Sequence, residues 1–363
     1  MLVLFADRAI VLQAKSKKLT LAARQGSDPH IQEDFKGAVQ DACDQAFTCS
    51  EELVAGKCSF TEEHGQEITL PKEIKQVFPV CVVSDHYPAL SFQVQQFLKS
   101  ETTDKIAAPL VSDVFMLDVM TEFLDTPLRS LSYLDLRARA GKNVMSSHEI
   151  TTLAYHLKQN LWLGEYDFVQ LGDDISADVD IAMAVRRDGV DGERRPKGIL
   201  TFLEGRSLGR IVEELNAMAT PWATAAGLEL LKLGSETADD LCTLIDRQAQ
   251  QGGRGANGSS SLAFSKEKMG LTVQCNNLPT LEAVGNLKRH CEARKYGQKA
   301  ALWIGLLIEP GTGKIRNCMV LDAPWKEDPE LSKAAARLTA VEPVKGVKKA
   351  REILSRYRGG KAK

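Results

Sequence analysis

Short apolar runs that flank one long amphipathic segment are the feature that most restricts how this chain can fold. Residues 2–6 and 9–15 are rich in β-forming side chains, and the polar pair Asp7-Arg8 between them predicts a tight hairpin turn. Apolar residues then recur at helical spacing over 29–55, and a buried-type strand is predicted at 77–83. This order of strands and helix is typical of an α/β domain.

We therefore expect a chain of mixed α/β and α+β class in four parts. Residues 1–103 are predicted to form an α/β domain, 104–165 a helical bridge, 166–341 an α+β domain, and 342–363 a basic tail. Contacts with a second copy of the chain, or with a protein partner, are expected to use the C-terminal α+β domain.

Local signals predict several boundaries within these parts. Thr126-Pro127 and a capping box from Ser146 to Glu149 each predict the start of a helix. The Gly/Ser-rich stretch 251–261 predicts a flexible loop. Two strand-like runs flank 309–313, whose Pro-Gly-Thr-Gly sequence predicts a hairpin turn.

Composition excludes several classes of protein. Of the 363 residues, 44% are hydrophobic and 26% are charged, and the formal net charge is −2. These proportions exclude a disordered or collagen-like chain, and the apolar runs are far shorter than the roughly 20 residues that span a bilayer. We expect a cytoplasmic protein without membrane contact, in which any affinity for nucleic acid is local. The eight cysteines include no CxxC pair, which predicts reduced thiols and no zinc site.

Gln13 and Lys15 are the strongest candidate functional residues. Side chains alternate along a strand, so these two point to one face while Leu12 and Ala14 point to the other. Polar groups on an apolar strand require partners, which favours a position in a cleft beside the 29–55 helix. A solvated edge strand is the alternative.

This segment resembles the restriction-endonuclease-like PD-(D/E)XK nuclease superfamily, in particular its nuclease-related branch. In that superfamily an Asp on one strand and an acid-x-Lys pair on the next surround a divalent metal. Gln13-x-Lys15 matches the second half, with Gln in place of the acid. The resemblance covers about the first quarter of the chain. It implies an Mg²⁺- or Mn²⁺-dependent endonuclease that hydrolyses DNA phosphodiesters in bacterial defence or repair, with Gln13 as a metal ligand and Lys15 acting on the attacking water.

The hairpin register places the expected metal-binding Asp at or before the first residue. With a two-residue turn at Asp7-Arg8, Lys15 pairs with the position before Met1, and with a three-residue turn it pairs with Met1 itself. Three explanations are open: a chain shortened at its start, a ligand from elsewhere in the chain, or a degenerate fold without catalysis. The last corresponds to the competing function, a non-catalytic module that binds nucleic acid or protein.

Residues along a phosphate path are expected to be basic or polar. Lys17, Lys18 and Arg24 extend the positive charge beyond the second strand, and Gln45 lies at the border of the apolar face of the predicted helix. A solvated basic loop would have the same composition. The stretch 343–363 carries eight cationic residues and one acid, a net charge of +7, and is a second candidate contact with nucleic acid or a solvated end.

Two other motifs lack residues that their function requires. The stretch 309–315 is similar to a phosphate-binding loop, but Ile308 and Ile315 stand where that loop requires Gly and Ser or Thr. Ser84-Asp85-His86 lies at a predicted strand end without a nucleophile elbow, which disfavours a hydrolase triad.

Overall fold

The computed structural model describes residues 1–18, 20–61, 64–83, 90–163, 166–264, 268–338 and 342–343. Its contacts divide the chain into two compact units, Met1–Phe202 and Leu203–Lys363. The boundaries predicted at 103 and 165 both lie inside the first unit, because the stretch between them supplies a strand and helices that pack on its sheet. The class is mixed α/β, with parallel and antiparallel strands.

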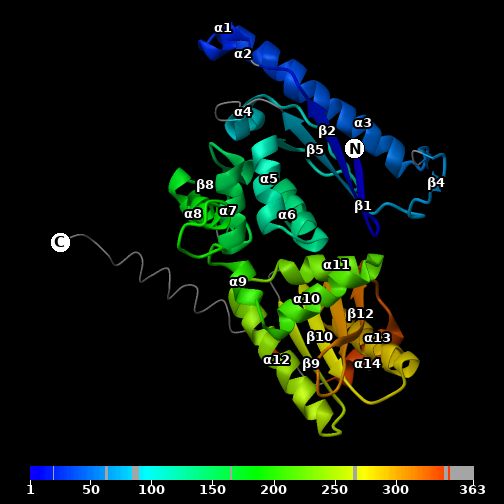
Figure 1. Cartoon of the computed structure of the whole chain (residues 1–363). Coiled ribbons are helices and arrows are strands. Elements are labelled where there is room, and N and C mark those ends of the chain that lie inside the picture. Colours follow the sequence, from blue (N-terminus) through cyan, green and yellow to red (C-terminus); the bar gives the residue numbers. More distant parts are fainter. Residues whose placement is uncertain are drawn as a thin grey trace. The chain divides into compact units, whose positions relative to one another are not determined.

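A four-stranded sheet organises the first unit (Figure 1). In spatial order its strands are β1 (Leu2–Phe5), β2 (Arg8–Lys15), β5 (Gln76–Val83) and β6 (Leu110–Asp113). β1 and β2 form an antiparallel hairpin, and β2, β5 and β6 are parallel. Parallel neighbours require crossover connections, which here contain α3 (Asp41–Val54) and α4 (Leu90–Phe97). The β-β-α-β-α order predicted from the sequence is confirmed for this sheet and its connecting helices, and the β3–β4 hairpin between α3 and β5 was not predicted.

The predicted 29–55 helix is one continuous helical element with a π-helical turn in its middle. It consists of α2 (Asp28–Phe35), the π-helical turn η1 (Lys36–Gln40) and then α3. Gly56, at φ +66°, follows its end.

The two faces of this sheet are covered by different helices. Ala9 and Val11 of β2 and Val77 and Cys81 of β5 are buried in one core with the apolar face of α3. Figure 1 shows α3 along one side of these strands and α5 and α6 on the other. Phe78, which points to the second side, is also buried.

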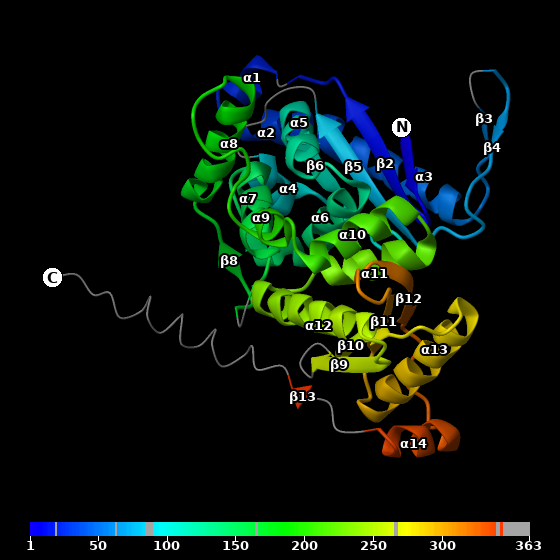
Figure 2. The same cartoon turned by 60° about the horizontal axis from the view of Figure 1, so that its bottom comes forward.

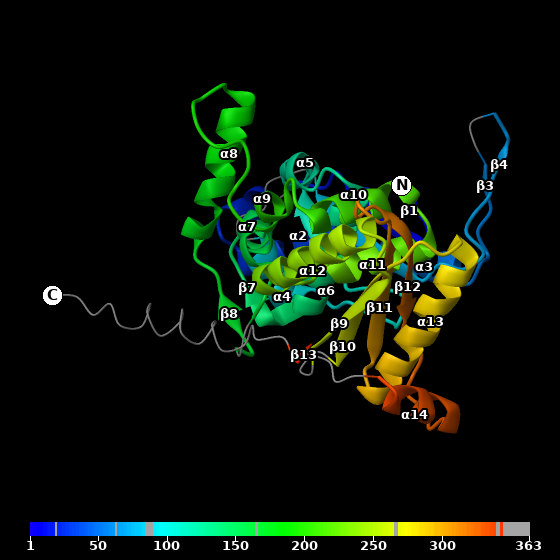
Figure 3. The same cartoon turned by 90° about the horizontal axis from the view of Figure 1, so that it is seen from below.

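Smaller elements complete the first unit, and Figure 3 shows α8 and the β3–β4 hairpin projecting from it. They are, in chain order, α1 (Leu21–Arg24), β3 (Phe60–Thr61), β4 (Glu67–Ile68), α5 (Val114–Phe123), α6 (Pro127–Ala140), η2 (Gly141–Asn143), β7 (Val144–Met145), α7 (Glu149–Gln159), β8 (Val169–Gln170), η3 (Asp173–Ser176) and α8 (Ala177–Arg187). α9 (Ile199–Leu203) crosses the boundary between the units. Within the described residues, no helix is long and apolar enough to cross a membrane.

A second mixed sheet organises the other unit (Figure 2). Its strands, in spatial order, are β12 (Ile315–Leu321), β11 (Leu302–Ile308), β10 (Met269–Cys275), β9 (Gly258–Phe264) and β13 (Glu342–Pro343). The helices are α10 (Ser207–Met218), α11 (Pro221–Leu231), α12 (Ser235–Gly253), α13 (Thr280–Gly297) and α14 (Pro329–Ala336). α13 connects the parallel pair β10 and β11, and its buried residues pack on Trp303 and Leu307. The predicted hairpin at 309–313 is confirmed, because β11 and β12 are antiparallel neighbours.

The β1–β2 turn lies one residue earlier than predicted. Phe5 pairs with Arg8, so the turn is formed by Ala6 and Asp7, with Ala6 in the left-handed region at φ +53°. Arg8 is the first residue of β2, and its guanidinium is buried in an ion pair with the Asp7 carboxylate at 2.5 Å. This ion pair explains why a residue that is usually exposed begins a strand.

The predicted Gly/Ser-rich loop is largely regular structure. α12 continues to Gly253 and β9 begins at Gly258, so little of 251–261 is loop. The serines of β9 pair with β10, and the hydroxyls of Ser261 and Thr272 lie 2.9 Å apart. The composition of 251–261 did not predict this strand, because pairing with β10 stabilises it.

The predicted capping box is also wrong. α7 begins at Glu149 with His148 as its N-cap, and the Ser146 hydroxyl lies 2.8 Å from the hydroxyl of Thr152. The Glu149 carboxylate is engaged by a long-range ion pair described below. The helix start at Thr126 is confirmed, since its hydroxyl accepts from the N–H of Arg129. Ser84-Asp85-His86 and the tail beyond 343 lie outside the described residues.

Candidate functional site

Gln13 and Lys15 lie on the side of the sheet that α3 covers. They continue the row of Ala9 and Val11, and Gln13 Nε2 donates a hydrogen bond to Cys49 Sγ on α3 at 3.7 Å. Gln45 is exposed and lies one helical turn before Cys49, on the same side of α3. We refer to Gln13, Lys15, Gln45 and Cys49 as the Lys15 corner. Its one described side-chain contact joins Gln13 to Cys49, and Lys15 and Gln45 belong to it by their positions on β2 and α3.

Lys15 is half-buried at the carboxyl end of β2. Its ammonium group forms no hydrogen bond or ion pair with any described residue. Carboxyl ends of parallel strands are where α/β sheets commonly bind ligands. A half-buried cation that no described residue pairs, at this end of the sheet, is suited to an anion.

The β1 hairpin does not extend alongside the Lys15 corner. Met1 pairs with Leu12, because its amino group donates to the Leu12 carbonyl at 2.8 Å and its carbonyl accepts from the Leu12 N–H at 2.9 Å. In this register no described residue of β1 lies opposite Gln13 or Lys15. A turn at Asp7-Arg8 would place the position opposite Lys15 directly before Met1. With the observed turn, that position lies two residues further before Met1.

Lys17 forms an internal ion pair with a buried carboxylate. Its Nζ lies 3.4 Å from Asp34 Oδ1 and donates to the Glu33 carbonyl, also at 3.4 Å. The backbone N–H and hydroxyl of Thr20 donate to Asp34 Oδ2 at 2.7 and 2.8 Å. Burial alone would raise the pKa of Asp34, but the Thr20 hydrogen bonds and the Lys17 charge together lower it. Gly37 passes close by, where a Cβ would lie 2.7 Å from Lys17 Nζ.

The other two residues predicted to contact nucleic acid are Lys18 and Arg24. Lys18 is exposed and has no partner among the described residues. Arg24 ends α1, and its side chain lies outside the described part of the chain. The structure thus directs Lys17 inward, whereas Lys15 and Lys18 have no charged partner in the part of the chain that it describes.

The described donors at the Lys15 corner do not fit Mg²⁺ or Mn²⁺. Mg²⁺ takes hard oxygen ligands that include one or two carboxylates. Gln13 offers an amide oxygen, its side-chain partner is the Cys49 thiol, and the Asp34 carboxylate is occupied by Thr20 and Lys17. Among the described residues, no group of three or more His, Cys, Asp or Glu side chains could hold a metal ion.

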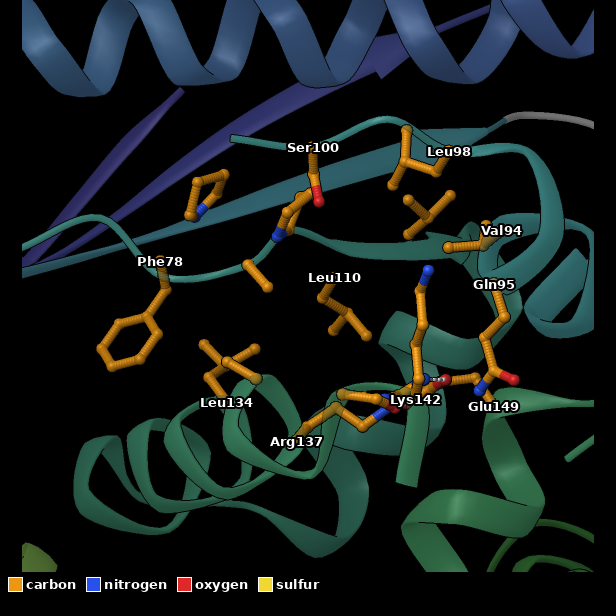
Figure 4. Close-up of a pocket in the computed structure, with 16 residues that line it drawn as sticks. Phe78, Val94, Gln95, Leu98, Ser100, Leu110, Leu134, Arg137, Lys142 and Glu149 are labelled. Carbon is orange, nitrogen blue, oxygen red and sulfur yellow. Dashed lines mark hydrogen bonds and ion pairs between the residues drawn. The ribbon is translucent and has the colours of Figure 1, made fainter. Parts of the chain in front are cut away.

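A cavity of about 230 Å³ lies between α4 and α6, beside β6. We call it the α4–α6 cavity. Figure 4 shows its apolar walls, which include Val94, Leu110 and Leu134, and a polar end formed by Arg137, Lys142 and Glu149. The cavity was not predicted, because its lining comes from segments far apart in the sequence and no short motif marks them.

A buried ion pair forms one wall of the α4–α6 cavity. Arg137 Nε and Nη2 donate to the two oxygens of Glu149 at 2.7 and 3.1 Å, and the Tyr133 hydroxyl donates to Glu149 Oε1 at 2.5 Å. Arg137 Nη1 donates to the Gly141 carbonyl at 3.3 Å. Burial disfavours the charged Arg137, yet the Glu149 charge and hydrogen bonds hold its pKa above the usual value. Charge pairing therefore leaves this wall neutral overall.

His156 packs behind this ion pair as a neutral side chain. Its ring centroid lies 5.1 Å from that of Tyr133, and its Nδ1 is buried without a hydrogen-bond partner. Burial lowers the pKa of His156 to about 3. The unfolded chain takes up a proton at this residue near pH 6.5, whereas the folded chain does not.

His156 is expected to make the first unit less stable as the pH falls below about 6.5. Only the unfolded state binds the proton between that pH and about 3, so the free energy of unfolding should fall by roughly 2 kcal/mol between pH 7 and pH 5. Urea denaturation at the two pH values tests this. His156→Phe should remove that part of the pH dependence, whereas His64→Asn, at an exposed position, should keep it. Equal pH dependence in wild type and His156→Phe would contradict the assignment.

No protein family, no curated protein and no solved structure matches this chain.

Proposed function

We propose that the first unit binds the phosphate backbone of nucleic acid, with DNA as the expected partner, through the Lys15 corner. The observation that carries the proposal is half-buried Lys15 at the carboxyl end of β2, whose ammonium group has no counterion among the described residues. Exposed Lys18 supplies a second cation three residues further along the chain. A phosphate oxygen next to Lys15 would compensate a charge that no described residue pairs.

The resemblance to nucleases supports a phosphodiester ligand, and the donor set at the corner supports binding without cleavage. Hydrolysis in that superfamily depends on carboxylates around a divalent cation, whereas the corner presents an amide and a thiol. We therefore favour the non-catalytic, nucleic-acid-binding alternative over a metal-dependent endonuclease.

Lys15→Gln in the full chain is expected to weaken DNA binding and to reduce its salt dependence. Each phosphate contact contributes about one unit to the slope of log K against log salt, so the slope should fall by roughly one. Fluorescence anisotropy with a labelled DNA duplex, repeated at several salt concentrations, measures both quantities. Lys57→Gln, at an exposed site after α3, is the matched control and should change neither.

The same samples, incubated with Mg²⁺ or Mn²⁺, separate binding from cleavage. We expect intact DNA. Cleavage that Lys15→Ala abolishes would show that a carboxylate from elsewhere completes a metal site, and the endonuclease alternative would replace the present one. Equal salt slopes for wild type, Lys15→Gln and Lys57→Gln would remove the Lys15 corner as the contact surface.

A further inference from the structure

The α4–α6 cavity has the composition of a site for an amphipathic molecule. Val94 and Leu98 of the α4 segment line one side, Leu134 of α6 lines the other, and Leu110 lies between them (Figure 4). Apolar walls of this kind favour an apolar ligand body, because its transfer from water contributes roughly 25 cal/mol for each Å² that is buried.

The charges at the polar end of the cavity do not cancel. The charged lining residues are Arg137, Lys142 and Glu149, which sum to +1. Arg137 and Glu149 satisfy each other through two hydrogen bonds. Lys142 is an exposed residue and has no hydrogen bond or ion pair with any described residue. Figure 4 shows its ammonium group directed toward the space between Leu110 and Val94.

The backbone around Lys142 fixes where this cation is presented. α6 ends at Ala140, and its C-cap Gly141 adopts φ +49°, a conformation that other residues rarely take. The Gly141 N–H bonds the Arg137 carbonyl, and the Gly141 carbonyl accepts from Arg137 Nη1. Lys142 therefore follows a turn that the buried Arg137 holds from both sides.

We propose that the α4–α6 cavity binds a small monocarboxylate with an apolar body. The carboxylate is held by Lys142 Nζ, and the apolar body lies on Leu110, Leu134 and Val94. The net charge of +1 at the polar end favours a single negative charge on the ligand, and the apolar walls favour an apolar body. This site is independent of the Lys15 corner, because it uses other residues.

Isothermal titration calorimetry of the full chain with octanoate tests the site. Octanol and octylammonium, which share the tail and differ in the headgroup, are the comparison ligands. We expect octanoate to bind at one site and at least tenfold more tightly than octanol, and octylammonium to bind more weakly than both. Absence of octanoate binding, or equal affinity for octanoate and octanol, would overturn the proposal.

Three variants locate the binding event. Lys142→Met keeps the length of the side chain and removes its charge, so it should abolish the preference for octanoate over octanol, whereas Lys142→Arg should retain it. Ala138→Leu fills part of the cavity and should weaken both ligands. Lys288→Met, on the exposed side of α13 in the other unit, is the charge-matched control and should change nothing. An unchanged preference in Lys142→Met would place any octanoate binding outside this cavity.

Discussion

Glu149→Gln is expected to lower the free energy of unfolding of the first unit by about 3–5 kcal/mol. Arg137 and Tyr133 both donate to this carboxylate, and the Arg137 side chain is only 13% exposed. Loss of the negative charge leaves a guanidinium largely removed from water with no counterion. Hydrogen exchange of peptides from α6 and α7 measures the effect within this unit.

A double variant distinguishes an unpaired charge from simple loss of packing. Arg137→Met with Glu149→Met removes both charges and keeps apolar volume, so it should be more stable than Glu149→Gln alone. Glu51→Gln, on the exposed side of α3, should leave exchange unchanged. If the double variant were less stable than the single one, the ion pair would be a net source of stability beyond charge compensation.

Gly270→Ala is expected to destabilise the second unit by about 1–3 kcal/mol or more. A Cβ at position 270 would overlap the ring of Trp303, the residue paired with it on β11. Trp303 is fully buried, and its Nε1 donates to the Thr272 hydroxyl at 3.0 Å, so the ring cannot move aside without losing that bond. Urea denaturation followed by tryptophan fluorescence measures the change.

The overlap predicts that substitutions at Gly270 and Trp303 have non-additive effects on the free energy of unfolding. Trp303→Phe makes room for the added methyl, so Gly270→Ala should cost less in that background than in the wild type. Gly285→Ala is the matched control: a Cβ there meets only the end of Arg289, and alanine is the better helix former by about 1 kcal/mol. Additive effects of Gly270→Ala and Trp303→Phe would show that the ring contact does not explain the cost.

Much of the first sheet could be predicted because its signals are local. Continuous apolar side chains mark β5, and helical periodicity with a following Gly56 marks the long helix. The β1–β2 turn was displaced by one residue because Arg8 enters the strand through its buried ion pair with Asp7. That interaction depends on burial, which residue propensities do not describe.

The candidate sites differ in how far sequence could reveal them. Gln13 and Lys15 share a face because strands alternate, and this rule needs no tertiary information. Lys17 lies in the same basic run, but its inward ion pair with Asp34 requires knowledge of how α2 packs. The spacing from Ser146 to Glu149 fits a capping box, but Glu149 binds Arg137 instead. A buried guanidinium without a counterion costs more free energy than a missing hydrogen bond at a helix start.

The π-helical turn Lys36–Gln40 determines the directions in which the side chains of α3 point relative to those of α2. An α-helix rotates by about 100° per residue, so one residue added within it redirects every side chain that follows. Asp34 before the turn is thereby directed to Lys17, while Ala42 after it faces the sheet. The number of residues between these two positions is thus constrained more strictly than their identity, apart from Gly37, where a Cβ would displace the end of the Lys17 side chain.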